Sequence, residues 1–266
     1  MHRLSSKLVT LGIALSLIMF IPLSAFAGPP FLTDDPEPVP YHHWELYSFF
    51  ASDKTAESNS YIGPAIELNN GVAPNTQAHL IIPYAYSAQD GVSFSGMGDI
   101  EMGIKFRFQP ETRRMPEIGV FPLMEISTGD SAKALGNGRT WFKVPIWFQK
   151  SWGDWTSYGG FGYAFNSAPG QRDYPYAGIL IQRTLSQQWT LGGEIFAQGA
   201  TAQSPPPQNP PISVPGETST MIWNVGGQYN FTPDFSFLFT TGHSFAGDGN
   251  SVMYFGLYRT WGPGSP

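Results

Sequence analysis

A histidine beside a serine is the feature of this chain that comes nearest to hydrolase chemistry. His243 precedes Ser244, and Asp248 follows shortly after. A serine nucleophile must lie within hydrogen-bond reach of its base. Neighbouring residues of an extended strand point to opposite faces, so these two side chains cannot pair within one strand. An enzyme would need a partner from another strand, and we predict that the chain is not an enzyme.

Two short runs carry oxygen atoms that could bind a metal ion. They are the acidic run from Asp34 to Glu37 and the run from Asp248 to Asn250, and neither has the full spacing of a calcium loop. The pair His42-His43 is a weak metal signal. The chain has no cysteine, which excludes thiolate ligands and thiol catalysis. We therefore expect no metal and no cofactor, and interpret the acidic run as a solvated segment or a plug.

Charged residues of both signs alternate with apolar residues between Asp99 and Gln109. Successive side chains of a strand point to opposite faces, so one face of this segment is ionic and the other is hydrocarbon. Similar alternation recurs in 117–126 and 140–150. If the ionic faces enclose a lumen, the candidate residues that line it are Glu45, Asp99, Glu101, Lys105, Arg107, Glu117, Glu125 and Lys143.

Strands are the elements that must position these side chains, because the period-two pattern recurs along the chain and helical periodicity is almost absent. Most of the segments have about the 9–11 residues that a tilted strand needs to cross a bilayer. The predicted strands cover 43–52, 61–69, 76–86, 98–109, 116–126, 140–152, 155–166, 174–185, 189–198, 218–231, 235–244 and 251–261.

The connections alternate between long and short. Outer-membrane barrels have longer external loops and short periplasmic turns. With an even number of strands and both ends in the periplasm, the longer loops are predicted outside, at 53–60, 87–97, 127–139, 167–173, 199–217 and 245–250. The run of prolines within 204–211 is interpreted as an extended connection.

The composition favours a membrane-spanning β-barrel. Charged residues make up 13% of the chain, against about 25% in an ordinary soluble domain. The mean hydropathy of −0.16 shows that polar and apolar residues are finely interleaved. A sheet in lipid must close on itself because unpaired backbone groups are costly there. The net charge of −6 argues against nucleic acid as a partner.

The N-terminus has the three parts of a secretory signal peptide. Positive residues precede an apolar run from Leu8 to Leu23, which is followed by Ala25-Phe26-Ala27. We predict a cleaved signal peptide at 1–27 and thus a protein of the Gram-negative outer membrane. The remaining regions are then an N-terminal periplasmic segment or plug at 28–42, the barrel at 43–261 and a tail at 262–266.

Aromatic residues near the predicted strand ends suggest belts at the membrane interfaces, where an apolar ring with a polar tip is favoured. The belt is predicted to contain Trp44, Trp141, Trp152, Trp155, Tyr158, Trp189 and Trp261. Proline removes a donor from the sheet. We therefore expect bulges at the strand prolines Pro64, Pro83, Pro122 and Pro145.

Several sequence blocks resemble a known family. The opening from Gly28 to Pro38, followed by His43-Trp44-Glu45, is similar to the start of transporter-like proteins associated with a meta-pathway of phenol degradation. The blocks 98–101, 127–130 and 149–153 also resemble that family. The resemblance would cover most of the chain after residue 27 and implies an outer-membrane barrel that passes small, in part aromatic, compounds. It carries no catalytic or ligand residues.

The end of the chain departs from the usual barrel pattern. An aromatic residue is expected at the last position, but 262–266 follow Trp261. The barrel-assembly machinery remains an expected partner, together with outer-membrane lipid.

These patterns predict a passive channel for small molecules, aromatic or hydrophobic ones among them. A closed structural or plugged barrel and an outer-membrane hydrolase are the alternatives. Within a channel, the ionic lumen either filters solutes by its field or only stiffens the wall through salt bridges. A soluble periplasmic sandwich is a further alternative, and it would bury the apolar stripe from Ile100 to Phe108 in a core.

Overall fold

Every segment with period-two alternation forms a strand. The computed structural model describes residues 30–56, 58–89, 91–203 and 216–263. The predicted signal peptide and the proline run at 204–211 lie outside these residues. The strands are β1 (Trp44–Lys54), β2 (Ser58–Ala73), β3 (Thr76–Gln89), β4 (Val92–Met97), β5 (Ile100–Gln109), β6 (Glu117–Val120), β7 (Leu123–Ile126), β8 (Trp141–Trp152), β9 (Trp155–Phe165), β10 (Tyr174–Thr184), β11 (Trp189–Gln198), β12 (Thr220–Thr232), β13 (Phe235–Ala246) and β14 (Ser251–Trp261).

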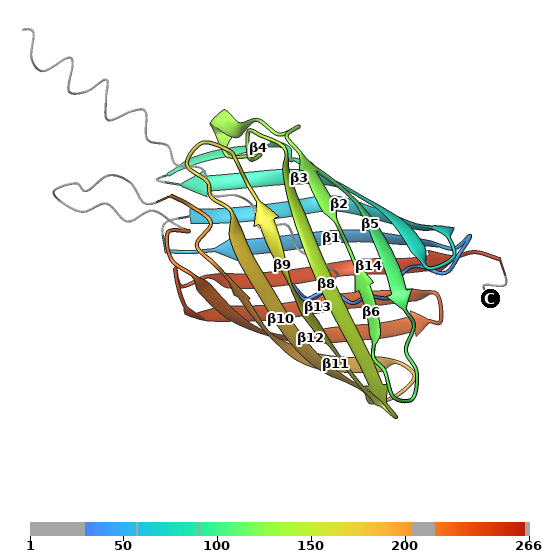
Figure 1. The fold of residues 1–266 in the computed structure, drawn as a ribbon. Coiled ribbons are helices and arrows are strands. Elements are labelled where there is room, and N and C mark those ends of the chain that lie inside the picture. The colour runs from blue at the N-terminus through green and yellow to red at the C-terminus, as the bar shows by residue number, and fades with distance from the viewer. Residues whose placement is uncertain (1–29, 57, 90, 204–215, 264–266) are drawn as a thin grey trace, which may run out of the picture.

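The strands close into an antiparallel barrel of twelve (Figure 1). β3 pairs with both β4 and β5, and β8 pairs with both β6 and β7. β4 and β5 together therefore count as one interrupted strand of the barrel, and so do β6 and β7. The first and last strands, β1 and β14, pair from Trp44 opposite Trp261 to Lys54 opposite Ser251. This pairing satisfies the edges that an open sheet would leave exposed. The predicted twelve-stranded barrel is therefore confirmed.

Burial alternates along the strands in the sense that a membrane barrel requires. On β5 the side chains of Phe106 and Phe108 face outward, with 51% of Phe108 exposed, whereas Glu101 and Lys105 face inward and are about 5% exposed or less. On β14, Phe255 faces outward and Tyr254 inward. The apolar stripes lie on the outside, and a soluble sandwich that buries them is excluded. No helix among the described residues is long and apolar enough to cross a membrane.

The predicted bounds of two long loops are wrong. β1 ends at Lys54 and β2 begins at Ser58, so little remains of the loop predicted at 53–60. β3 continues to Gln89 and β4 begins at Val92, so most of 87–97 is also strand. These hairpins are rich in polar residues, and strands that pair in water need no apolar face. The alternation from which a strand is predicted is therefore weak there. The segment 127–140 is a true connection and contains one 3₁₀ turn, η1 (Ser131–Lys133).

The strand prolines interrupt the sheet at three of the four expected positions. Pro64 lies where the register of β2 shifts against both neighbours. Pro83 lies where β3 changes partner from β5 to β4, and Pro122 separates β6 from β7. The bulge expected at Pro145 is absent, because β8 keeps its register through Pro145 opposite Gly162. There the missing donor is tolerated without a shift.

Two of the expected belt residues face inward. Trp141 is 1% exposed and packs in the barrel interior, and Tyr158 borders an internal cavity. The alternation of side chains along β8 and β9 points these two rings inward. The direction of a side chain therefore depends on this alternation and not on how near the residue lies to a strand end. The outward rings Trp152, Trp155 and Trp189 are more than 40% exposed and lie near the turns between β8 and β9 and between β10 and β11.

Candidate functional site

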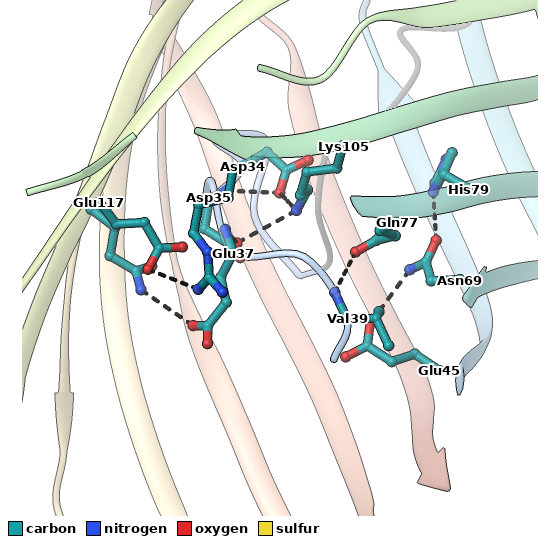
Figure 2. Close-up of polar contacts among 12 residues, drawn as sticks. Asp34, Asp35, Glu37, Val39, Glu45, Asn69, Gln77, His79, Lys105 and Glu117 are labelled. Carbon is teal, nitrogen blue, oxygen red and sulfur yellow. Dashed lines mark hydrogen bonds and ion pairs between the residues drawn. The ribbon is translucent and has the colours of Figure 1, made fainter. Parts of the chain in front are cut away.

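The segment 30–41 runs inside the barrel before β1 begins. The Thr240 hydroxyl on β13 donates to the Pro30 carbonyl oxygen, and the Val39 amide donates to the Gln77 side chain on β3. Tyr41 then forms a bridge with Gly71 near the end of β2. Figure 2 shows this segment crossing between strands from different sides of the wall. The chain therefore lines its own lumen with its N-terminal residues.

Glu194 holds the start of this segment. Its two carboxylate oxygens accept the backbone N–H groups of Leu32 (2.8 Å) and Thr33 (2.7 Å), and Asn224 donates to the same carboxylate at 2.5 Å. Glu194 is buried, with 3% of the residue exposed. Hydrogen bonds to a charged acceptor are stronger than neutral ones. One inward side chain on β11 thus fixes two successive peptide units.

Lys105 holds the middle of the segment. Its ammonium nitrogen lies 3.0 Å from Asp34 Oδ1 and 3.4 Å from Asp35 Oδ1 (Figure 2). The same ammonium nitrogen lies over the Phe121 ring, 5.0 Å from the ring centroid. A buried ammonium requires a partner charge, because its desolvation is costly when it is unpaired. The alternating stripe of β5 therefore supplies the cation that the acidic run needs.

Glycines on the inner wall make room for the segment. A β-carbon at Gly178 would collide with the Thr33 side chain. At Gly119 it would lie 3.0 Å from the Pro36 carbonyl oxygen, and at Gly71 it would collide with Pro40. Glycine within a strand often marks a close approach of another chain segment. The wall is thus shaped to receive residues 30–41.

Six of the eight predicted lumen residues are buried, namely Asp99, Glu101, Lys105, Glu117, Glu125 and Lys143, whereas Glu45 and Arg107 are partly buried. Several of the eight form ion pairs. Glu101 lies 2.8 Å from the Lys143 ammonium, and Arg107 lies 3.3 Å from Glu117. His79, which the sequence analysis did not select, lies 3.2 Å from Glu101. Such pairs match the hypothesis of a salt-bridged wall better than that of free charges.

The other predicted residues have different surroundings. The carboxylate of Asp99 accepts the backbone N–H groups of Gly129 and Asn137 and thereby holds the connection after β7. Glu125 is buried on β7. Glu45 accepts from the Tyr258 hydroxyl at 2.6 Å. Of the eight predicted residues, only Glu45 and Lys105 border the internal cavity described next.

A cavity of about 510 Å³, here called the chamber, lies inside the barrel beside the segment. Its wall includes residues that flank the short turns, such as Ser151 and Thr156 around the turn at 153–154, and Gln182 near the end of β10. Glu37 borders it as well and accepts from Gln149 at 3.4 Å. Burial by the surrounding wall, reinforced by the charge of Asp35, raises the pKa of Glu37.

The barrel interior beyond the chamber is aromatic. The rings of Trp141, Trp147, Tyr174 and Tyr176 form one buried cluster, which Phe121, Leu123 and Ala164 complete and against which Phe196 packs. Leu32 of the N-terminal segment packs in an adjacent cluster with Ile222 and Val252. These rings fill space that a wide pore would leave to water. The interior thus has an aromatic part and a polar chamber.

Several residues of this interior were not predicted from the sequence. Glu194, Glu67, His79 and Gln77 lie on predicted strands, but their strands show weaker alternation than β5. The inward glycines were an available signal, since a glycine within a strand points to close approach. What the glycines approach could not be read from the sequence.

The residues considered for catalysis and metal binding lie apart. Ser244 faces inward, whereas His243 is exposed and its Nδ1 lies 3.0 Å from Ser251 Oγ across the hairpin. No carboxylate contacts His243 among the interactions of the described residues, so the group that would orient it is missing there. Asp34 and Asp35 bind Lys105. No group of three or more metal-binding side chains occurs in the described ranges.

Comparison with known proteins supports the fold through structure. No protein-family model matches the sequence, and no curated protein matches it. An outer membrane channel from Pseudomonas putida F1 superimposes with a TM-score of 0.69 at 12% identity, over 85% of this chain and 98% of that chain. The NanC porin gives 0.53 at 8% identity, over 80% and 98%. The translocator domain of the autotransporter NalP from Neisseria meningitidis gives 0.51 at 12% identity, over 81% and 88%.

These similarities show an outer-membrane barrel fold. Identities this low carry no information about a solute. The resemblance to the phenol-degradation family is therefore supported only as far as the outer-membrane barrel fold.

Proposed function

We propose that this protein is a passive channel of the outer membrane for small molecules, aromatic compounds among them. The observation that carries the proposal is the polar chamber of about 510 Å³ inside a closed barrel, bordered by the segment 30–41. Twelve strands enclose more space than the filled eight-stranded barrel and less than a sixteen-stranded porin. Because the N-terminal segment occupies part of that space, we infer a narrow pore whose width this segment sets.

The supporting similarity is to a solved outer membrane channel that spans most of this chain. The rings of Tyr47, Tyr158 and Tyr258, which border the chamber, offer apolar surface to an aromatic solute. In this proposal the ion pairs of β5 and β8 keep the wall rigid, and the predicted lumen residues act on solutes mainly at Glu45 and Lys105.

Conductance across a planar bilayer tests the proposal. The refolded protein without residues 1–27 is expected to give small, stable current steps in concentrated KCl. The variant Glu194→Ala removes the acceptor of the Leu32 and Thr33 amides, and its steps are expected to be larger because the segment is released. Glu111→Ala is a suitable control, since Glu111 lies in the turn before β6 and contacts Lys150.

A closed barrel is the second candidate, favoured by the number of bonds that hold the segment in place. It predicts no current from the wild-type protein and current steps only from Glu194→Ala. Absence of current from both proteins would refute the channel proposal.

A further inference from the structure

The chamber is lined by more carboxyl groups than basic groups. Among the described residues that line it are the carboxylates Asp34, Asp35, Glu37, Glu45 and Glu67, whereas the basic residues are Lys105 and His79. Lys105 is shared between two of the carboxylates. His79 lies between Glu67, at 3.6 Å, and Glu101, at 3.2 Å, and so has carboxylates on both sides. Lys105 and His79 therefore pair with only some of the carboxyl groups that border the chamber.

One carboxylate oxygen in this wall lacks a partner. Asp34 is 2% exposed, and its Oδ1 accepts from both Lys105 and the Asp35 amide. Its Oδ2 is buried and makes no hydrogen bond within the described part of the chain. A buried carboxylate oxygen without a donor is costly, and native proteins satisfy nearly all such groups. A donor supplied from the chamber would satisfy it.

Glu45 offers a second acceptor without a basic partner. Its Oε1 and Oε2 accept from the hydroxyl groups of Tyr258 and Tyr47, at 2.6 and 3.2 Å, and no salt bridge joins it to a basic side chain among the described residues. The rings of Tyr47 and Tyr258 stack at 4.5 Å and, with Phe31, also border the chamber. Aromatic faces attract ammonium groups. Carboxylates and rings thus surround one space.

From this arrangement we infer that the chamber is a binding site for small organic cations that carry an ammonium group, such as aromatic amines. The inference rests on the proposed channel and names the class of solute that it holds. The volume of the chamber lies within the range of pockets that bind small ligands, about 300–1,000 Å³. An ammonium donates hydrogen bonds to Asp34 Oδ2, which has no partner, and to the remaining lone pairs of the Glu45 carboxylate, and its substituent lies against the rings.

Calorimetric titration of the refolded barrel in a non-ionic detergent tests the inference with three probes of similar size. Benzylammonium is expected to bind, and benzyl alcohol and benzoate at least tenfold more weakly. Glu45→Gln keeps the size of the side chain and removes its charge, and is expected to weaken benzylammonium binding about tenfold, the effect of one charge-assisted hydrogen bond. If Glu45→Gln does not fold, the same titration with benzylammonium is carried out on a second variant, Asp35→Asn.

The control variant is Asp154→Asn, which removes a carboxylate at the exposed turn between β8 and β9. It is expected to bind benzylammonium as the wild type does. Equal binding of the three probes, or equal losses in Asp154→Asn and Glu45→Gln, would overturn the inference. The conductance measurement is separate: a barrel that conducts without this preference refutes the cation site, and one that binds benzylammonium but never conducts refutes the channel.

Discussion

The ammonium of Lys105 lies 3.0 Å from Asp34, and both side chains are buried inside the barrel. One residue comes from the alternating ionic stripe of β5 and the other from the segment that precedes the first strand. Their contact joins the wall of the barrel to the chain that crosses its interior.

Loss of this contact is expected to destabilise the barrel. Lys105→Met keeps the length of the side chain but leaves the buried Asp34 without its cation, a change that typically costs about 3–5 kcal/mol. Urea titration of the refolded protein in lipid vesicles measures this loss. The matched control is Lys133→Met, because the pair of Lys133 and Asp130 is about half exposed and such pairs contribute about 0–1 kcal/mol. Equal midpoints for the two variants would show that the buried pair does not hold the segment.

A methyl group added at Gly178 is expected to displace the N-terminal segment. Gly178→Ala forces the new carbon against Thr33, and overpacking of this kind costs about 1–3 kcal/mol. The segment should then be cleaved faster by an added protease, with the barrel itself intact. Gly193→Ala is the control, since its new carbon would lie 3.3 Å from its nearest neighbour, the Asn224 carbonyl oxygen. A segment equally resistant in both variants would contradict the fit between wall and segment.

Glu37 is expected to make the protein less stable as the pH rises. Its side chain borders the chamber, but the surrounding wall desolvates it and raises its pKa, with a contribution from Asp35. The folded protein therefore binds this proton more tightly than the unfolded chain does, and the stabilisation from the protonated form is lost as the pH rises through the folded pKa.

Glu37→Gln removes this titration. The variant should be more stable than the wild type at neutral pH and should approach it below the pKa of an unfolded glutamate. Unfolding midpoints measured across this pH range check the prediction. A constant difference between the two proteins at all pH values would exclude the assigned role of Glu37. In the channel, the same proton removes a negative charge, so cation preference should also decrease on acidification.

A charge on the outward face is expected to oppose insertion into lipid. Ile104 lies at the centre of the outward stripe of β5 and is 46% exposed. Arginine on the lipid face of a barrel costs about 2–4 kcal/mol at the middle of the bilayer and about 0–1 kcal/mol near its edge. Ile104→Arg should therefore destabilise the barrel in vesicles far more than Trp155→Arg, beside the two-residue turn. Equal effects would place Ile104 outside the lipid region.

The outer face of the barrel could be predicted because one physical rule determines it. Lipid accepts apolar side chains and the backbone must be paired, so the alternation of Phe106 and Phe108 with Lys105 and Arg107 is sufficient to orient β5. The number of strands followed from counting such segments. The strands that meet at the hairpins Lys54–Ser58 and Gln89–Val92 were predicted too short. Strand pairing beyond the apolar band leaves no alternating pattern in the side chains, so the sequence does not mark these strand ends.

By itself, therefore, the sequence determined the barrel, the number of its strands and, on a strand such as β5, which side chains form the ionic face and which form the apolar face. Only the tertiary structure decided which charges meet. Glu194 is far from Leu32 in the chain, and Lys105 is far from Asp34, so no periodicity relates them. Their pairing depends on the path of residues 30–41 through a closed wall, and that path is fixed by long-range contacts and by the space that Gly178 and Gly119 leave open.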